Sequence, residues 1–490
     1  MDSSRAVAIV AALVVAVLTV TVTVTAGAEP EHRTSAPVQV TAGSARAGER
    51  VEVVVTTPDA IGAGGVEGVV VVVERRHGTA WTRVGTVTPD TTGRVTVQVV
   101  VDRLPAHNLV RARAEVVGIP GPWREATLGL DATRSTVVVT APARVVDGKH
   151  ARVTVRWSAV DVRDGVGVVG VPGTVVLQRQ VKRSGRWSGW STFRVLQTDA
   201  AGRAGVRVRP RYSHRWRVVT RPSTWTTTPR SSVARTRNVP PGHPVRLPAK
   251  APRPRITLGP QARADTSGAD VTVRRIPDAV WRSMRGISWR PGCPVGRSHL
   301  RLVETNYYAF DGYRRRGQVV VAAVVVDNFV GAFRDMHAAK VPIRSLRLPD
   351  RFGRSTRLGG ADDLRSMAAD NTSVFNCRAV VGRPHARSPH SWGRSLDLNP
   401  WENPFRSGWG VVPNTWWPSR SHPDVAWRST RHRVVRILAR NGFRWTYGHG
   451  DLHHFDAVPG RAARASASAS ELRQDEELQQ TLRECDFHCE

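Results

Sequence analysis

Two short stretches rich in histidine and aspartate have the residue types of a catalytic metal site. The first spans residues 388–399 (SPHSWGRSLDLN) and holds His390 and Asp397 seven residues apart, with Gly393 between them. A glycine allows a tight bend, and the leucines that alternate with Asp397 predict a short strand. We therefore expect His390, from a loop, and Asp397, from a strand, to face one centre. Imidazole nitrogen and carboxylate oxygen are both ligands that Zn²⁺ accepts.

A catalytic zinc ion needs a third protein ligand and one open position. The third ligand is expected in residues 448–456 (GHGDLHHFD), where Asp451 precedes His454 by three residues. This offset lets His454 bind metal while Asp451 acts as general base and then general acid. His453 competes with His454 for the ligand position and is otherwise expected at the rim, near substrate. Either stretch taken alone is more typical of a structural histidine–aspartate pair than of a metal site.

In this order, the patterns SxHxxGxxxD and DxxHFD resemble the VanY-like group. This group comprises the zinc D-alanyl-D-alanine carboxypeptidases and L-alanyl-D-glutamate endopeptidases of bacterial cell walls. The endopeptidase branch is also similar in its aspartate base, and in the runs DLNPWENP at 397–404 and DNTSVFNCR at 370–378. The resemblance covers roughly residues 275–458 and implies zinc ligands His390, Asp397 and His454, with Asp451 as base. It implies peptidoglycan stem peptides as substrates, and it leaves carboxypeptidase and endopeptidase specificity open.

Four further residues receive roles from this resemblance. Arg378 is expected to pair with a substrate carboxylate or to stabilise the tetrahedral oxyanion, the alternative being an ordinary surface arginine. Ser388, Asn371 and His453 are expected to bind substrate. For Ser388 the alternative is a turn cap beside the zinc loop.

The formal charge of +32 is the most unusual feature of the composition, and only four of the 72 basic residues are lysines. Such a charge favours a polyanionic partner, which for an exported protein means anionic wall polymers or lipid head groups. Codon usage that favours arginine is the alternative explanation. No helix-turn-helix, RNA-binding or zinc-finger pattern is present, so we do not expect nucleic acid as a partner.

The chain begins with the features of an export signal. An apolar run at 6–25 follows Arg5 and precedes Ala26-Gly27-Ala28, which predicts a cleaved signal peptide at 1–28. The run is long enough to span a bilayer, so an uncleaved signal anchor is the alternative and would be the only membrane contact. Either reading predicts an exported, extracellular protein, and the resemblance to the VanY-like group implies that it is associated with the cell wall.

Export permits disulfides, and the chain has four cysteines. Cys293 and Cys377 are expected to join the opening of the enzyme-like region to the strand before the metal loop. Cys485 and Cys489 flank His488 and could form a terminal disulfide, a metal site or nothing of consequence.

Two all-β domains are predicted before the enzyme-like region, at 37–132 and 133–237. Val-rich runs separated by turns are typical of β-sandwiches. The pattern recurs at a period near 107 residues, because Gly68-Val69-Val70 is echoed by Gly173-Thr174-Val175 and 110–115 by 215–220. The two copies predict tandem domains that resemble bacterial Ig-like modules. The sequence does not tell whether they act as spacers or bind a ligand.

The remaining segments complete a multidomain plan. Residues 238–274 are rich in proline and arginine and predict an extended, semi-rigid linker. Residues 275–458 predict an α+β domain with a small antiparallel sheet, with strands at 300–306 and 318–326 and helices at 327–339 and 423–441. Residues 459–490 are expected to be a disordered tail, with a short helix in it as the alternative.

Three functions remain open on the sequence. The leading one is a secreted zinc peptidase that acts on peptidoglycan. The second is a non-catalytic wall-binding or adhesion protein with a relic peptidase fold, against which the retained base Asp451 argues. The third is a polyanion binder that depends on charge alone.

Overall fold

The computed structural model describes residues 37–58, 68–162, 167–221, 223–381, 383–460, 464–465 and 467–484. The predicted signal at 1–28 and the cysteines at 485 and 489 lie outside these residues. The chain divides into two compact units, one holding the first sandwich and the other holding most of the second sandwich and everything C-terminal to it. Within the described ranges, every helix is too short or too polar to span a bilayer.

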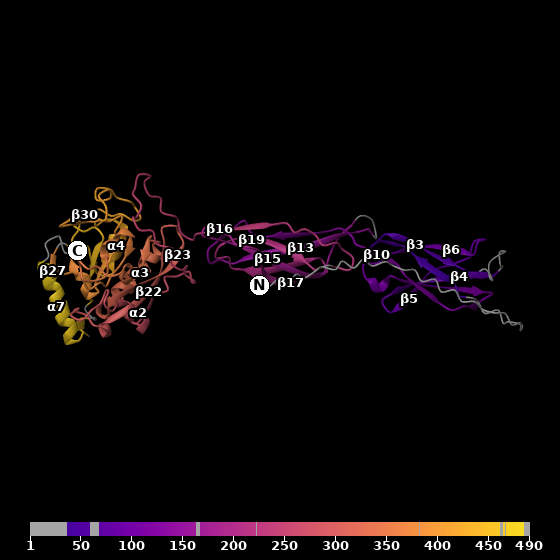
Figure 1. Cartoon of the computed structure of the whole chain (residues 1–490), viewed down its shortest axis with the longest axis horizontal. Helices are drawn as coiled ribbons and strands as arrows, with labels where there is room; N and C mark the ends of the chain where they lie inside the picture. Colours follow the sequence, from indigo (N-terminus) through magenta and orange to yellow (C-terminus); the bar gives the residue numbers. More distant parts are fainter. Residues whose placement is uncertain are drawn as a thin grey trace, which may run out of the picture. The chain divides into compact units, whose positions relative to one another are not determined.

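The first domain is a β-sandwich whose core is almost entirely valine. One sheet has the strand order β1-β3-β6, and the other has β5-β4-β7 with β8 and β9 both paired to β7. Successive side chains of a strand point to opposite faces, so Val53 and Val55 are fully buried while Glu52 is exposed. The strands are β1 (Gln39–Ala42), β2 (Ser44–Arg46), β3 (Arg50–Thr56), β4 (Val69–His77), β5 (Ala80–Val87), β6 (Arg94–Val100), β7 (Leu109–Val116), β8 (Ile119–Pro120), β9 (Arg124–Thr127) and β10 (Gly129–Asp131) (Figure 1).

The second domain repeats this plan with longer strands. One sheet has the order β11-β13-β14 with β18 on β13, and the other has β12-β20-β19-β15-β16 with β17 on β15. Two tryptophans, Trp157 and Trp216, are 1% exposed and fill its core. The strands are β11 (Ser135–Thr140), β12 (Arg144–Val146), β13 (Ala151–Asp161), β14 (Gly167–Gly170), β15 (Gly173–Arg183), β16 (Arg186–Trp187), β17 (Ser191–Thr198), β18 (Arg203–Val208), β19 (Ser213–Thr220) and β20 (Ala234–Val239).

The internal repeat seen in the sequence corresponds to equivalent strand pairs. In the first domain β4 and β7 pair antiparallel with Val69 opposite Val116. In the second domain β15 and β19 pair antiparallel with Val175 opposite Thr220. The prediction of two sandwiches followed by an α+β domain is therefore confirmed.

The C-terminal domain is built on two small antiparallel sheets. The longer sheet is β21-β22-β23, and the shorter is β28-β32-β31. Helix α3 packs on β22 through Phe329, Phe333 and Met336, which share one core with Leu396 and Phe455 of the shorter sheet. The main elements are β21 (Thr272–Arg275), α2 (Asp278–Met284), β22 (Leu300–Tyr308), β23 (Arg314–Ala322), α3 (Val326–Ala338), β24 (Ser345–Leu346), α4 (Asp363–Ala368), β25 (Asn371–Thr372), β26 (Ala379–Val380), β27 (Arg383–Arg387), η5 (Pro389–Trp392), β28 (Ser395–Asp397), β29 (Phe405–Ser407), β30 (Gly410–Val412), α5 (Arg433–Arg440), β31 (Phe443–Arg444) and β32 (His454–Ala457).

One predicted helix is shorter than expected. A helix was predicted over 423–441, but α5 begins only at Arg433. The backbones of His422 and Ala426 instead bond each other as an isolated bridge, which a helix does not permit. The helix can start later because the side chain of His432 accepts a hydrogen bond from the Val434 amide at 3.2 Å and caps the first turn.

The proline- and arginine-rich segment at 238–274 is docked on the C-terminal domain rather than exposed as a solvated linker. The indole nitrogen of Trp401 donates to the Pro252 carbonyl at 2.8 Å. The backbone N–H of Ile256 donates to the carbonyl of Ala368 at 3.0 Å. The segment thus accepts a hydrogen bond from the domain at Pro252 and donates one to it at Ile256, which anchors it at two points.

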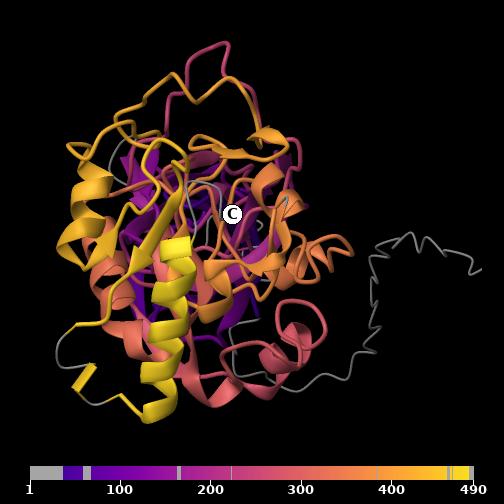
Figure 2. The same ribbon diagram turned by 90° about the vertical axis from the view of Figure 1, so that its left-hand side faces the viewer.

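Where the sequence predicted a disordered tail, the structure has a 16-residue helix, α7 (Ala469–Glu484), the yellow helix of Figure 2. Leu478 is 2% exposed and packs in one core cluster with Trp392, which follows the predicted ligand His390 by two residues. The guanidinium of Arg394, itself 1% exposed, forms an ion pair with Asp475. The apolar anchor and the ion pair explain why a segment of low overall hydrophobicity orders on the domain.

We predict that Asp475→Ala destabilises the C-terminal domain by about 2–4 kcal/mol, because it leaves the buried Arg394 without its carboxylate. The measurement is the denaturant midpoint of unfolding of the full chain. Glu476→Ala, an exposed carboxylate on the same helix, is the matched control and should change little. Release of α7 would appear as new protease cleavage within residues 469–484. An unchanged midpoint and an unchanged cleavage pattern would contradict the importance of this pair.

Candidate metal centre

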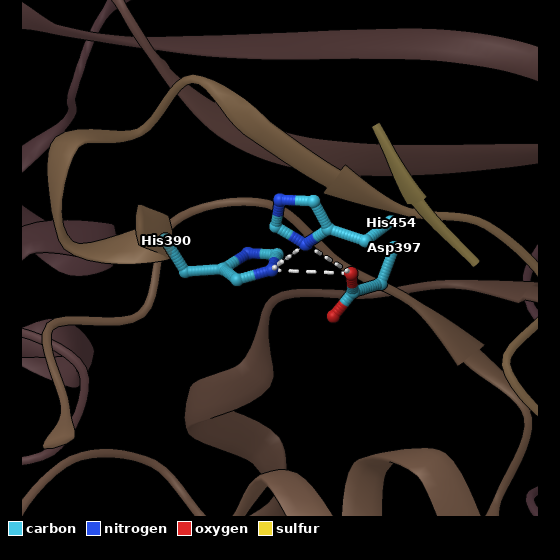
Figure 3. A group of neighbouring side chains, drawn as sticks. All are labelled: His390, Asp397 and His454. Carbon is cyan, nitrogen blue, oxygen red and sulfur yellow. Dashed lines mark hydrogen bonds and ion pairs between the residues drawn. The ribbon is translucent and has the colours of Figure 1, made fainter. Parts of the chain in front are cut away.

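Three side chains that are far apart in the sequence meet inside the C-terminal domain. His390 lies in η5, Asp397 ends β28 and His454 begins β32. The distances are 3.1 Å from His390 Nε2 to Asp397 Oδ1, 3.2 Å from His390 Nε2 to His454 Nδ1, and 3.4 Å from His454 Nδ1 to Asp397 Oδ1. Figure 3 shows these three side chains pointing toward one another. The sequence prediction named these three residues as the ligands, and the fold brings them together.

The pairing of β28 with β32 explains why two of the three meet. Asp397 lies directly opposite His454 in the antiparallel register, so both side chains leave the same face of the sheet. The neighbouring pair in the register, Leu396 and Phe455, lies on the other face of the sheet and is fully buried. The strand alternation thus separates a polar centre from the apolar core.

The turn at Gly393 returns the chain so that His390 can face Asp397. Gly393 has φ 69°, a left-handed conformation that side chains with a Cβ disfavour. A Cβ at this position would also lie 3.0 Å from the amide nitrogen of Ala322, which donates a hydrogen bond to the Gly393 carbonyl. The expectation that Gly393 forms a tight bend between the two ligands is confirmed.

Both imidazoles are oriented by a hydrogen bond from the nitrogen that faces away from the centre. His390 Nδ1 donates to the Val374 carbonyl at 2.6 Å, which leaves Nε2 unprotonated and directed at the centre. His454 Nε2 lies 3.0 Å from Asp456 Oδ1, which leaves Nδ1 as the inward atom. Outer partners of this kind fix the tautomer of metal-binding histidines and raise their basicity.

Asp456 is a functional residue that the sequence analysis did not assign. Its carboxylate accepts hydrogen bonds from Ser395 Oγ and Thr446 Oγ1, each at 2.6 Å, besides the contact with His454. Burial raises the pKa of Asp456, but the charge of His454 and these hydrogen bonds outweigh burial and lower it overall. Its position could have indicated this role, because Asp456 follows His454 by two residues and residues two apart on a strand share a face.

The donor set suits a divalent transition metal. Two imidazole nitrogens and one carboxylate oxygen are the three protein ligands of many catalytic zinc sites. Ligands about 2.0 Å from a tetrahedral ion are themselves about 3.3 Å apart, and the three inward atoms are separated by 3.1–3.4 Å. Within the described part of the chain these residues form a group able to hold a metal ion. All three are 1% exposed or less.

The predicted base Asp451 lies beside this group. Its Oδ1 accepts a hydrogen bond from the His454 backbone N–H at 3.3 Å and is 3.5 Å from His453 Nε2. The side chain is almost fully buried. The carboxylate is therefore adjacent to a ligand residue without belonging to the ligand group.

His453 was expected at the rim, yet its side chain is fully buried. Nδ1 donates to the Asn403 carbonyl at 2.6 Å, and Nε2 lies 3.7 Å from Asp397 Oδ1 and 3.5 Å from Asp451 Oδ1. Its ring also contacts Phe405 edge-on. His453 thus sits between the ligand carboxylate and the predicted base, a position that depends on packing which the sequence did not reveal.

The other predicted site residues are also buried. Arg378 is 1% exposed and donates to Asp363 Oδ2 at 3.0 Å, so it is not a surface arginine. Asn371 uses both ends of its amide internally, because it bonds the backbone of Arg347 through Oδ1 and through Nδ2 at 3.0 Å each. Ser388 precedes η5, and its Oγ has no hydrogen-bond partner among the described residues.

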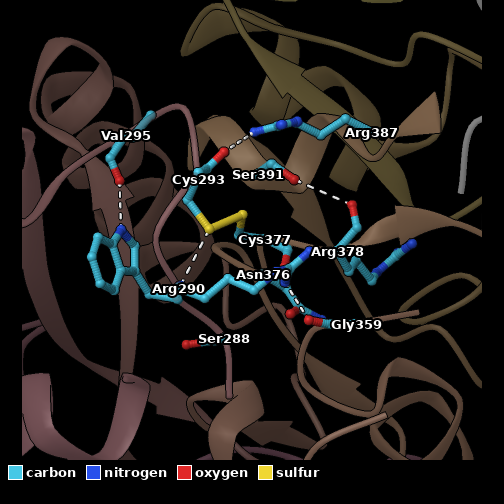
Figure 4. Close-up of a disulfide and its surroundings, with 12 residues drawn as sticks. Ser288, Arg290, Cys293, Val295, Gly359, Asn376, Cys377, Arg378, Arg387 and Ser391 are labelled. Carbon is cyan, nitrogen blue, oxygen red and sulfur yellow. Dashed lines mark hydrogen bonds between the residues drawn. A yellow bond between two sulfur atoms is a disulfide. The ribbon is translucent and has the colours of Figure 1, made fainter. Parts of the chain in front are cut away.

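Cys293 and Cys377 form a disulfide with an S–S distance of 2.06 Å, which confirms the predicted pair (Figure 4). Next to it, the backbone N–H of Asn376 donates to the His390 carbonyl at 3.2 Å. The Cys377 carbonyl accepts from Arg290 Nη1 at 2.6 Å. The disulfide therefore fixes the irregular segment 374–378, against which the His390 loop is held.

A tyrosine connects the centre to the C-terminal helix. The ring of Tyr447 lies 5.0 Å from the His454 ring, centroid to centroid. Tyr447 also packs with Val380, and Leu482 of α7 packs against this pair. The sequence analysis assigned no role to Tyr447, because the contact depends on the docking of a helix that was not foreseen.

Comparison with known proteins identifies the region that holds the centre. Residues 381–457 match a family model described as D-alanyl-D-alanine carboxypeptidase. This segment contains the three ligand residues, Asp451 and His453. Among curated proteins, none matches the chain. The match covers a small part of the chain and indicates a carboxypeptidase-like domain at this position.

Solved structures with similarity to the chain include two adhesins. The adhesin InvE of Yersinia pseudotuberculosis is 16% identical, with 41% of this chain and 58% of that chain covered and a TM-score of 0.28. A tetra-tandem repeat from the extending region of a large adhesion protein is 12% identical, with 59% and 64% covered and a TM-score of 0.30. This chain spans less than two thirds of either structure. At these TM-scores neither likeness identifies a fold or function for this chain.

We predict that Asp456→Asn lowers the affinity of the centre for Zn²⁺ by about 10–100-fold, because an amide orients and polarises His454 less well than a carboxylate. The affinity is measured by competition with a chromophoric chelator. Asp327→Asn, an exposed position on α3, is the control that makes the same chemical change. Equal zinc affinities of the two variants would show that Asp456 does not contribute to metal binding.

Proposed function

We propose that the C-terminal domain is a zinc peptidase that hydrolyses peptide bonds in peptidoglycan stem peptides. The observation that carries this proposal is the convergence of two imidazole nitrogens and a carboxylate oxygen within 3.4 Å of one another, with the carboxylate of Asp451 next to them. The carboxypeptidase-like match over the same residues supports the substrate class. We further propose that the protein is exported and acts at the cell wall, with anionic wall polymers as a further partner.

The residues present define the roles that the reaction requires. A zinc ion held by His390, Asp397 and His454 would polarise the scissile carbonyl and acidify a bound water. Asp451 accepts the proton of the attacking water and later delivers it to the leaving amine. The hydrogen bond from the His454 backbone N–H holds the Asp451 carboxylate at the centre throughout.

His453 supports Asp451 and Asp397 from within the domain. Because Nδ1 donates to the Asn403 carbonyl, Nε2 is the ring atom that faces both carboxylates, 3.7 Å from Asp397 Oδ1 and 3.5 Å from Asp451 Oδ1. We propose that His453 positions these two carboxylates, and its contact with substrate stays a prediction.

Substrate contacts by Arg378, Asn371 and Ser388 remain predictions. Arg378 would have to share its guanidinium between Asp363 and a substrate oxygen. Asn371 bonds backbone and side-chain groups inside the domain through both ends of its amide, so a contact would cost existing hydrogen bonds. Ser388, with its Oγ unbonded among the described residues, needs no such exchange.

The test is hydrolysis of defined stem peptides by the zinc-loaded chain, followed by mass spectrometry. A peptide ending in D-alanyl-D-alanine and one containing the L-alanyl-D-glutamate bond distinguish the two specificities. We predict that Asp451→Asn lowers kcat/KM by about 10²–10⁴-fold, because general acid–base catalysis contributes a factor of this size. The zinc content of that variant should stay unchanged.

Asp327→Asn should retain full activity. Intact peptides after incubation with fully zinc-loaded protein would overturn the proposed function. Binding to purified sacculi without any release of fragments would then favour the alternative of a non-catalytic wall-binding protein.

A further inference from the structure

A pocket separate from the metal centre lies between the docked proline-rich segment and the C-terminal domain. Its volume is about 400 Å³, within the size range of small-molecule sites. The proline-rich segment supplies one wall, including Leu247 and Ile256, and the domain supplies Arg315 and residues 344–347. The lining includes none of the residues placed in the metal centre.

Hydrogen bonds fix the segment wall in place. The Ile256 amide donates to the Ala368 carbonyl at 3.0 Å. The side chain of Gln261 reaches across the boundary, and its Nε2 donates to the carbonyl of Leu346 at 2.9 Å and to that of Arg316 at 3.0 Å. The pocket is therefore a formed feature of the fold and does not need a ligand to create it.

The charged residues that line the pocket are all arginines, namely Arg253, Arg315, Arg344 and Arg347. Two of them have carboxylate partners. Arg344 is held by Asp370 at 2.5 Å and by Glu402 at 2.6 Å, and Arg315 by Asp311 at 2.5 Å.

The other two arginines have no such partners, because Arg253 is exposed and Arg347 Nη2 donates to the Gly259 carbonyl. Within the described residues, neither Arg253 nor Arg347 has a carboxylate within ion-pair distance. Arg347 Nε is buried and has no hydrogen-bond partner there. Burial lowers the pKa of Arg347, and the neighbouring charges of Arg351 and Arg315 lower it further, while Tyr307 opposes them. Four guanidinium groups with three carboxylate partners leave the pocket with an excess of positive charge.

The remaining lining favours an organic anion over a bare ion. Leu247, Pro254, Ile256 and Leu258 add apolar surface to the lining of the same pocket. Two guanidinium groups offer more donors than a single carboxylate can accept, whereas a phosphate group carries more charge and three free oxygens. We propose that this pocket binds a phosphate ester, with Arg253 and Arg347 holding the phosphate and the apolar wall contacting its organic part.

The test uses the full chain in phosphate-free buffer at constant ionic strength. Glycerol 3-phosphate, inorganic phosphate and acetate are titrated by calorimetry. We expect the two phosphates to bind in a saturable way, glycerol 3-phosphate more tightly, and acetate to bind at least tenfold more weakly. Arg253→Gln/Arg347→Gln should weaken phosphate binding by tenfold or more. Arg347→Lys, which keeps the charge but loses the planar fork, should weaken it by a smaller factor.

The matched control is Arg83→Gln/Arg94→Gln, which removes the same charge from exposed positions of the first sandwich. Poly(glycerol phosphate) and phosphatidylglycerol vesicles form two further arms that distinguish a polymer from a lipid source of the phosphate. Saturable binding of glycerol 3-phosphate that only the pocket variant loses supports the proposal. Binding that both double variants lose equally, or binding to polymer or vesicles alone, overturns it, because both results would reflect total charge.

Discussion

The C-terminal domain is organised by the need to bury six ionisable side chains together. They are no more than 4% exposed, namely His390, Asp397, Asp451, His453, His454 and Asp456. Groups of this kind are costly to remove from water unless each is hydrogen-bonded or paired. The surrounding backbone supplies partners for the outer faces, through the carbonyls of Val374 and Asn403. The inner face is left with a set of electron-pair donors, and a bound cation would reduce the repulsion between them.

This constraint explains why the local elements are short. β28 has three residues and β32 has four, just enough to set Ser395 opposite Asp456 and Asp397 opposite His454. Ser395 donates a hydrogen bond to Asp456, the carboxylate that orients His454. This pair of strands therefore carries two predicted ligands, Asp397 and His454, together with the residue that orients His454. The disulfide at Cys377 and the turn at Gly393 add the third ligand from a separate loop.

Local patterns in the sequence predicted the parts of the fold that depend on local physics. Val-rich runs between turns located the strands of both sandwiches, and two spaced motifs together with the family they resemble located His390, Asp397 and His454. The placement of His453 and Asn371 could not be predicted in this way, because it depends on Asn403 and Arg347, which lie 50 and 24 residues away in the sequence. The docking of α7 and of the proline-rich segment rests on a few long-range contacts, such as those of Asp475 and Trp401, that composition alone does not reveal.

The register of β28 against β32 determines whether the three donor atoms come together. A slip of one residue would send Asp397 to the apolar side and bring Leu396 or Leu398 opposite His454. Such a chain would retain most of its backbone hydrogen bonds but would lose one of the three donors. Metal binding at this centre would therefore require the native register of these two strands, and the metal content of a preparation would measure the fraction of chains that have it.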